Sequence, residues 1–161
     1  AKVRESQWGI ALKKHVDDLV TSIEGTEVPD FTVTDEEGNK VSMSSLRGSV
    51  VVLDFWASWC GPCRKEGENV KAIYKDFHDK GFDVLGVSLD NKLDAWKKAI
   101  QDDGIEWGQV SDLQGWKTPM TKLYDFHAIP YLLLVDGEGR IVAKNLRGEA
   151  LRAKVAEICG K

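Results

Sequence analysis

The feature that most restricts the fold is a pair of cysteines three residues apart, shortly after an almost continuous apolar run. Residues 50–55 read Val-Val-Val-Leu-Asp-Phe, a pattern typical of a central strand that is covered on both faces. Cys60 and Cys63 follow, and beyond them the apolar residues recur at helical spacing until a second apolar run at 82–89. Strand, helix and strand in this order predict a parallel crossover, with the cysteines where the first strand passes into the helix.

The remaining apolar patterns predict two hairpins and four more helices. The hairpin arms are joined by polar turns that contain glycine, and the helices carry apolar residues at intervals of three and four. The expected hairpin arms are 31–33 with 40–42 and 131–135 with 140–143, and the expected helices are 6–23, 92–102, 118–126 and 149–158. On the second of these helices, Leu93, Trp96 and Ile100 form the apolar face. Thr118 and Pro119 start the third as its cap and first-turn proline.

Length and composition predict one globular domain and exclude several classes of protein. The chain has 161 residues, 42% of them hydrophobic, and a formal net charge of −4. This composition excludes bulk disorder and gives no basic footprint for nucleic acid. The longest apolar runs are far shorter than the roughly 18 residues that a membrane-spanning helix needs. We therefore expect an amphipathic extension at residues 1–25 and one main domain at 26–161.

The position of the cysteines at a helix start favours redox chemistry. The unpaired N–H groups and the positive end of the helix dipole stabilise a thiolate at Cys60. Cys63, one turn further into the helix, can attack the mixed disulfide that Cys60 forms with a partner and release the product. Pro62 stiffens the loop between the cysteines, and Gly61 allows the backbone of a partner to approach closely.

Two other roles for the cysteine pair remain open at this point. A zinc knuckle would need two more ligands from Cys159 and the three histidines, and none of these forms a second close pair. A purely structural disulfide would constrain the unfolded chain little, because the loop that it closes is short. Cys159 lies on the apolar face of the last helix and is expected to be a buried, inert thiol.

Asp54 is the one charged residue in the run at 50–55. An acid at this position is expected to be partly buried beneath the cysteine pair, and burial raises its pKa. Such a group can accept the proton of Cys63 during resolution. The alternative is an acid exposed at the edge of the sheet.

Two separate stretches resemble a known family. Asp-Phe-Trp-Ala at 54–57 and Trp-Cys-Gly-Pro-Cys at 59–63 look like the active-site stretch of thioredoxin, and residues 124–134 are similar to its cis-proline segment. Val-Pro-Asp-Phe at 28–31, the glycine hairpin that follows, and Leu-Arg-Gly at 46–48 resemble the TlpA/ResA-like thiol-disulfide oxidoreductases, as does the extra segment 90–116. The resemblance implies a thioredoxin-like α/β fold with a mixed central sheet flanked by helices, an N-terminal β-hairpin and an inserted helical segment.

The resemblance also implies roles for individual residues. Cys60 would be the exposed nucleophile and Cys63 the buried resolving cysteine, with a cis peptide bond between Ile129 and Pro130. The backbone of that loop would pair with an extended substrate segment. The residues expected to contact substrate are Trp59, Gly61, Pro62, Ile129 and Pro130. Trp56 is expected to pack around the active site together with Trp59.

Glu66 matches an acid that TlpA/ResA-like proteins keep near the active site, so we group it with Asp54 as a catalytic candidate. A solvated helix charge is the competing interpretation of Glu66. His127, near the proline loop, is a weaker candidate for tuning the thiols, since a loop histidine is usually just solvated.

Three positions depart from the family pattern. Glu68 stands where a helix-kinking proline is usual, so the helix is expected to be straighter, with Gly67 supplying any bend. Tyr131 replaces a threonine and narrows the expected substrate groove. Gly86 stands where thioredoxin has a lysine beside the buried acid, so Asp54 would lack a cationic partner.

The predicted function is thiol-disulfide exchange, directed towards reduction because Gly-Pro separates the cysteines as in reducing thioredoxins. The expected partners are disulfide-containing proteins and an upstream dithiol reductant. Neither a metal nor an organic cofactor is implied, and the helix at 6–23 could support self-association. The resemblance implies an extracytoplasmic, periplasmic location with a signal or anchor preceding Ala1, and a cytoplasmic location is the alternative.

Two other functions compete with exchange. The first is peroxide reduction, because Pro-Asp-Phe at 29–31 also resembles the peroxiredoxin-related branch. Peroxidases of that branch place a lone cysteine after a proline-threonine pattern, which is missing here. The second is a non-catalytic thioredoxin-fold binding module.

Overall fold

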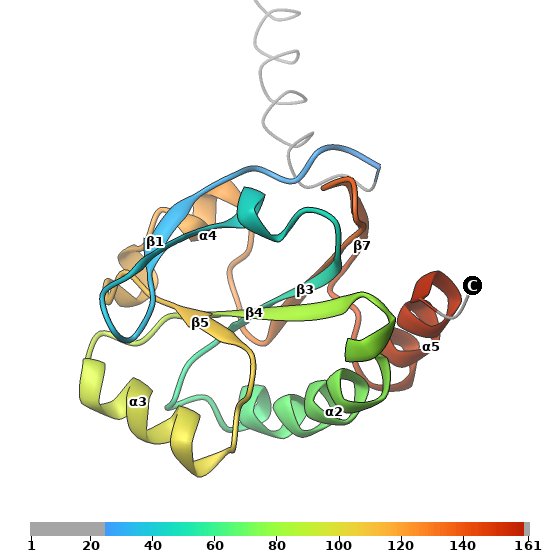
Figure 1. Ribbon diagram of the computed structural model, residues 1–161. Helices are drawn as coiled ribbons and strands as arrows, with labels where there is room; N and C mark the ends of the chain where they lie inside the picture. Colours follow the sequence, from blue (N-terminus) through green and yellow to red (C-terminus); the bar gives the residue numbers. More distant parts are fainter. Residues whose placement is uncertain (1–24, 160–161) are drawn as a thin grey trace, which may run out of the picture.

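A computed structural model describes residues 25–159 of the chain. Its centre is a five-stranded sheet in the order β5-β4-β3-β6-β7 (Figure 1). The strands are β3 (Val50–Trp56), β4 (Phe82–Ser88), β5 (Gly108–Val110), β6 (Tyr131–Val135) and β7 (Ile141–Lys144). The helix predicted at 6–23, and any self-association through it, lie outside the described residues.

β3 is the central strand, and its register makes the sheet mixed. It pairs in parallel with β4, Asp54 lying opposite Gly86, and antiparallel with β6, Asp54 lying opposite Leu132. Six of its seven residues are buried, as the almost continuous apolar run predicts. The parallel crossover and the mixed sheet are therefore confirmed.

Helices cover one face of this sheet, and the hairpin covers the other. In Figure 1, α2 (Gly61–Phe77), α3 (Leu93–Asp102) and α5 (Gly148–Cys159) lie below the sheet. Above it lie α4 (Met120–Leu123) and the hairpin of β1 (Thr32–Thr34) and β2 (Lys40–Ser42). The connecting 3-10 turns are η2 (Met43–Leu46), η3 (His78–Lys80) and η4 (Gly115–Lys117).

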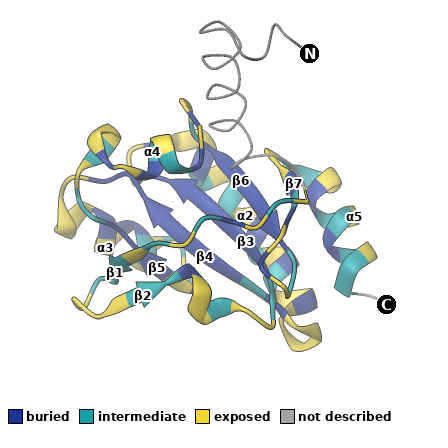
Figure 2. Ribbon diagram, turned by 90° about the horizontal axis from the view of Figure 1, so that it is seen from above, coloured by how far each residue is buried: buried dark blue, intermediate teal, exposed yellow. Residues whose placement is uncertain are grey.

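The core consists of two apolar clusters, and the alternation of side chains along β3 sends neighbouring residues to different clusters. Leu53 and Phe55 belong to the cluster beneath the hairpin, where Phe55 packs against Tyr124 and Phe126. Val52 points to the opposite face and joins the cluster beneath α2 and α5. Viewed from above, the strands of the central sheet form the buried interior of the domain (Figure 2).

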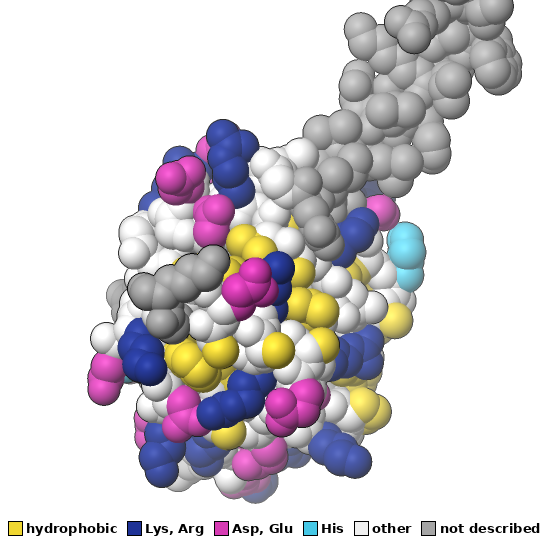
Figure 3. Space-filling model, turned by 90° about the vertical axis from the view of Figure 1, so that its right-hand side faces the viewer, with side chains coloured by type: hydrophobic (Ala, Val, Ile, Leu, Met, Phe, Trp, Pro, Cys, Tyr) yellow, Lys and Arg dark blue, Asp and Glu magenta, His cyan; other side chains and the backbone are white. Residues whose placement is uncertain are grey.

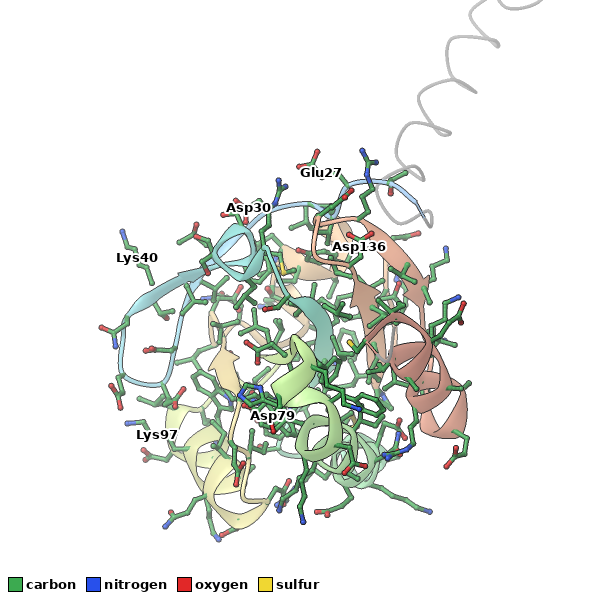
Figure 4. The ribbon with its side chains drawn as sticks, turned by 45° about the vertical axis from the view of Figure 1, so that its right-hand side comes forward. Glu27, Asp30, Lys40, Asp79, Lys97 and Asp136 are labelled. Atoms are coloured by element: carbon green, nitrogen blue, oxygen red, sulfur yellow. A yellow bond between two sulfur atoms is a disulfide. The ribbon has the colours of Figure 1, made fainter. Side chains whose placement is uncertain are left out.

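The segment ahead of the hairpin is bound to β7 and to the residue that follows α4. The backbone N–H of Gly25 donates to the carbonyl of Ile141, and the hydroxyl of Tyr124 donates to the carbonyl of Pro29 at 2.6 Å. Glu27 forms an ion pair with Arg47. Figure 4 shows Glu27 at this edge of the molecule. It also shows the side chain of Lys40, on the hairpin, pointing away from the body of the domain.

Two of the predicted elements needed correction. The helix expected to reach Phe126 ends at Leu123, because Asp125 adopts a left-handed φ of 53° that a helix cannot contain. Leu93 does not join the apolar face of α3, because it is 38% exposed and the buried residues of α3 are Trp96 and Ala99.

The segment 90–116 is not purely helical, because it also contains an edge strand. β5 pairs in parallel with β4, but it has only three residues and includes a glycine and a glutamine. A run this short and this polar carries no alternating apolar signal. This strand is therefore not predicted from the sequence.

The surface carries charges of both signs. Figure 3 shows acidic and basic side chains interspersed over the side of the molecule that carries β7 and α5. Such a face offers no extended basic patch for a polyanion. Between residues 25 and 159, no helix is long and apolar enough to cross a membrane.

Candidate functional site

The cysteine pair lies where β3 passes into α2. Cys60 and Cys63 form a disulfide with their Cα atoms 5.3 Å apart. Cys60 is the N-cap of α2, and its sulfur accepts a hydrogen bond from the backbone N–H of Cys63 at 3.3 Å. The sulfur thus faces an N–H that is otherwise unpaired at a helix start, in a field that favours negative charge. Cys60 is 7% exposed and Cys63 is 2% exposed, so Cys60 is the more accessible of the two.

The proline loop lies against the disulfide. The peptide bond between Ile129 and Pro130 is cis, as the resemblance implies. The carbonyl oxygen of Ile129 lies 4.0 Å from the sulfur of Cys60. A partner that reaches Cys60 must therefore pass the backbone of this loop.

The turn that carries Cys60 is held by Asp90, which the sequence analysis did not single out as a site residue. Asp90 is 1% exposed and accepts hydrogen bonds from the backbone N–H and the hydroxyl of Ser58 and from the hydroxyl of Ser88. A buried carboxylate is retained where several donors satisfy it. The position of Asp90 just after β4 is the signal that could have revealed it, because adjacent parallel strands end at the same edge of a sheet.

A second unpredicted contact fixes the first turn of α2. The guanidinium of Arg64 donates two hydrogen bonds to the carboxylate of Asp103, at 2.8 and 2.7 Å, and a longer one to the carbonyl of Ser58. A bidentate pair of this kind sets orientation as well as adding energy. It connects the residue after Cys63 to the end of α3.

Asp54 is buried beneath the cysteines. It is 5% exposed, which excludes the alternative of an edge-exposed acid. The pKa of Asp54 is raised from 3.8 to about 7, chiefly by burial and in addition by the negative charge of Glu66. Asp54 and Cys63 line one crevice with a volume of about 10 Å³, which is about enough for one water molecule. A carboxyl group that titrates near neutrality and shares a crevice with the resolving cysteine can exchange a proton with it.

Comparisons with known proteins identify the family. The sequence profile of the AhpC/TSA family matches residues 25–144. The chain belongs to the AhpC/TSA family. Within it, the chain is 28% identical over 137 residues to the thiol-disulfide oxidoreductase ResA of Bacillus thuringiensis subsp. konkukian, a match that covers 85% of this chain and 77% of that protein.

Solved structures agree with this assignment. The chain is similar to the thioredoxin domain of a thiol-disulfide oxidoreductase from Bacteroides vulgatus, with 39% identity and a TM-score of 0.80 over 85% of this chain and 98% of that one. It is also similar to a thiol:disulfide interchange protein from a Bacteroides species, with 38% identity and a TM-score of 0.80 over 88% of this chain and 93% of that one. This AhpC/TSA family member is thus a TlpA/ResA-like thiol-disulfide oxidoreductase of the thioredoxin superfamily, with its redox pair at Cys60 and Cys63.

In this family member Glu66 is not a freely solvated charge, because its carboxylate is held by hydrogen bonds. Its carboxylate accepts hydrogen bonds from the backbone N–H of Gly148 at 2.8 Å and from the side-chain amide of Asn69 at 3.1 Å. Gly148 is the first residue of α5. Glu66 therefore connects α2 to the start of α5, and it also acts on Asp54 through its charge.

The expected substrate-contact residues differ in exposure. Gly61 and Pro62 are exposed at the start of α2, Ile129 is half-buried and Pro130 is buried. The expectation that Trp59 packs around the site was wrong, because Trp59 is 57% exposed. An exposed indole beside the cysteine pair is available to a partner.

Two further candidates lie away from the disulfide chemistry. His127 is exposed, and its ring lies 3.8 Å from Asp125 rather than facing a cysteine. Cys159 is half-buried rather than buried, and its partial burial raises the pKa of the thiol. Within the described part of the chain, no group of three or more acidic, histidine or cysteine side chains is arranged to hold a metal ion.

Proposed function

We propose that this thiol-disulfide oxidoreductase reduces disulfides in partner proteins, with Cys60 as nucleophile, Cys63 as resolving cysteine and Asp54 as proton acceptor. The observation that carries this assignment is the position of the Cys60 sulfur. It caps α2, accepts the N–H of Cys63 and is the more accessible sulfur of the pair. A sulfur in this environment is stabilised as a thiolate and leaves readily.

The first step forms a mixed disulfide. The thiolate of Cys60 attacks one sulfur of the substrate disulfide, so that a bond forms between these sulfurs and the substrate disulfide breaks. The other substrate sulfur leaves as a thiolate and takes a proton from water. Ile129 and Pro130 present backbone beside Cys60, and the substrate segment would pair with it as an added strand.

The second step releases the product. Cys63 gives its proton to Asp54 and attacks the sulfur of Cys60, so that the Cys60–Cys63 disulfide forms and the substrate leaves with both sulfurs reduced. Two electrons pass from the enzyme to the substrate. A dithiol reductant then restores the reduced pair. The carboxyl of Asp54 suits this task because its pKa of about 7 lies between those of an ordinary carboxyl and a thiol.

Trapping of the mixed disulfide tests these roles. On a Cys159→Ser background, which removes the third thiol, Cys63→Ser is expected to accumulate a covalent adduct with an oxidised protein substrate. The matched variant Cys60→Ser is expected to form none. Equal trapping by both variants would contradict the assignment. Partner capture that persists without either cysteine would instead support the binding-module alternative.

The peroxide-reducing alternative predicts a different outcome. The attacking cysteine here has its bonded partner three residues away, whereas that alternative rests on a lone peroxidatic cysteine. Peroxide consumption by the reduced protein is expected to be slow compared with its reduction of a protein disulfide. Faster turnover of peroxide that depends on Cys60 alone would overturn the proposed substrate class.

We further propose that the protein acts outside the cytoplasm, in a periplasmic compartment. The resemblance to TlpA/ResA-like proteins supports this location, and an oxidising compartment supplies the disulfides that such an enzyme reduces. Fractionation of the native cells, followed by detection of the protein, tests it. Recovery in the cytoplasmic fraction alone would contradict it.

A further inference from the structure

The residue that pairs with Asp54 on β4 is a glycine, Gly86, and has no side chain. Gly86 pairs with Asp54 on β3 and with Gln109 on β5, so the three residues form one row across three strands. A Cβ at Gly86 would overlap the nitrogen and the oxygen of the Gln109 amide. A side chain at this position would therefore displace the amide of Gln109, which fills the room above the glycine.

This amide is buried, and within the described part of the chain only its oxygen forms a hydrogen bond. Gln109 is 2% exposed, and its oxygen accepts a hydrogen bond from the indole N–H of Trp56 at 2.8 Å. Its nitrogen has no hydrogen-bond partner among residues 25–159. A buried donor without a partner is unusual, because buried polar groups are almost always paired.

Asp54 is the acid that the register of the sheet brings towards this donor. Register partners point to the same face, and neighbouring strands lie about 4.8 Å apart. The amide above Gly86 is thus about one strand spacing from the Cβ of Asp54. A carboxylate formed there can reach the free N–H by rotation of a side chain or through a bridging water.

None of the other described groups around Asp54 offers its carboxylate a free hydrogen-bond donor or cation. The charged and titratable groups that face it come from α2 and from the residue after α3, and they are Cys63, Arg64, Glu66, Glu68, Lys71 and Asp103. The two cations among them are engaged, since Arg64 binds the carboxylate of Asp103 and Lys71 donates to its backbone carbonyl. The β6 partner of Asp54, Leu132, is apolar.

We propose that Gln109 is the positioning residue of the proton acceptor: its free amide N–H stabilises the carboxylate form of Asp54, while its oxygen holds Trp56. This inference rests on the proposed function, in which Asp54 takes the proton of Cys63. Gln109 does not touch the reacting sulfurs. It limits how far burial raises the pKa of Asp54, and among the described residues around Asp54 no free cation can do this.

Direct titration of Asp54 tests the proposal. The carboxyl carbon of Asp54 can be followed by NMR in the oxidised protein labelled with 13C-aspartate, with Asp54→Asn identifying its signal. Gln109→Met keeps the approximate volume of the side chain and removes the amide. The midpoint of Asp54 is expected to rise by about one pH unit, as for loss of one hydrogen bond to a charged group. A folded variant with an unchanged midpoint would overturn the proposal.

A second variant and a control separate this effect from damage to the fold. Gly86→Ala displaces the amide but removes no hydrogen-bonding group, and its midpoint is expected to rise as well. If Gln109→Met does not fold, the midpoint measured in Gly86→Ala decides whether the amide of Gln109 stabilises the carboxylate of Asp54. Ser111→Ala is the matched control, because Ser111 is buried two residues after Gln109, just beyond the end of β5, and its hydroxyl donates to the Ser88 carbonyl. This control is expected to lose stability and leave the midpoint unchanged.

The role of Asp54 as proton acceptor and the role of Gln109 as its positioning residue can be tested separately. If Gln109→Met moves the NMR midpoint but the pH profile of disulfide exchange stays in place, Asp54 is not the proton acceptor and the proposed function is wrong on this point. If the exchange rate follows the Asp54 midpoint in the wild type and Gln109→Met moves neither, the role of Gln109 is wrong and the proposed function stands.

Discussion

Asp54 and Cys63 line one crevice, although they come from different elements: Asp54 from the middle of β3 and Cys63 from the first turn of α2. Asp54 lies opposite Gly86 and Leu132, neither of which can bind a carboxylate through its side chain. The sheet thus places an acid beneath a redox pair, opposite two residues that offer it no polar side chain. This arrangement makes the charge of Asp54 costly and therefore sensitive to its few polar neighbours.

Asp54→Asn is expected to stabilise the oxidised protein at alkaline pH. The folded pKa of about 7 lies above the ordinary value of 3.8, so the unfolded chain loses this proton first as pH rises. The contribution of Asp54 to stability is therefore fully present below pH 4 and is lost as pH rises to about 7. The shift of roughly 3 units corresponds to about 4 kcal/mol. Urea unfolding of the wild type and Asp54→Asn at pH 4 and pH 8 measures this loss of stability.

The control for this variant is Asp94→Asn, because Asp94 is exposed on α3. Its stability is expected to follow that of the wild type at both pH values. Parallel curves for the wild type and Asp54→Asn would show that Asp54 titrates normally, which would contradict its burial as an uncharged group.

Glu66→Gln is expected to lower the pKa of Asp54. Burial raises this pKa first and the charge of Glu66 adds to it, so removal of the charge removes the second contribution. The glutamine oxygen can still accept the N–H of Gly148. Glu66→Ala removes this hydrogen bond too and is expected to cost about 1 kcal/mol of stability in addition. The 13C titration of Asp54 tests the shift, and an increase in either variant would contradict it.

Asp90→Ala is expected to destabilise the protein by about 3 kcal/mol, because it leaves the N–H of Ser58 and two hydroxyl groups without their acceptor in a buried site. Because Ser58 precedes Cys60 by two residues, the variant is also expected to exchange disulfides more slowly. Urea unfolding and exchange kinetics measure the two effects. Asp94→Ala serves as control, and an exchange rate equal to the wild type would show that Asp90 does not position the turn.

Tyr124→Phe is expected to lower stability without changing exchange. The hydroxyl of Tyr124 donates to the carbonyl of Pro29 at 2.6 Å, between α4 and the segment ahead of the hairpin. Loss of one such hydrogen bond costs about 1 kcal/mol. Thermal unfolding and exchange kinetics check the two halves of this prediction. A large fall in exchange rate would contradict this prediction and show that the hydrogen bond between Tyr124 and Pro29 is needed for disulfide exchange.

The sequence predicted the parts of the fold that carry strong periodic signals. The buried run at 50–55, the helix after the cysteines and the C-terminal hairpin all lie where their patterns indicated. It also predicted the burial of Asp54, because a single charge within an apolar strand has few other places to lie.

What the sequence did not reveal depends on contacts between distant residues. β5 is too short and polar for a pattern, and the role of Gln109 emerges only when the register sets it across Gly86. Asp90 likewise binds Ser58, which lies 32 residues away in the chain, and Glu66 binds Gly148, which lies 82 residues away. Spacing along one element cannot indicate such pairs, since the fold alone brings them together.

The most direct test of the central claim is the equilibrium reduction potential of the Cys60–Cys63 pair. It can be measured by titration in thiol/disulfide buffers with quantification of free thiols, on the Cys159→Ser background. A reductase of partner disulfides predicts one reversible two-electron transition near the roughly −270 mV of thioredoxin. A value near about −120 mV would instead indicate a disulfide donor. Failure to form any reversible bond would contradict the redox function itself.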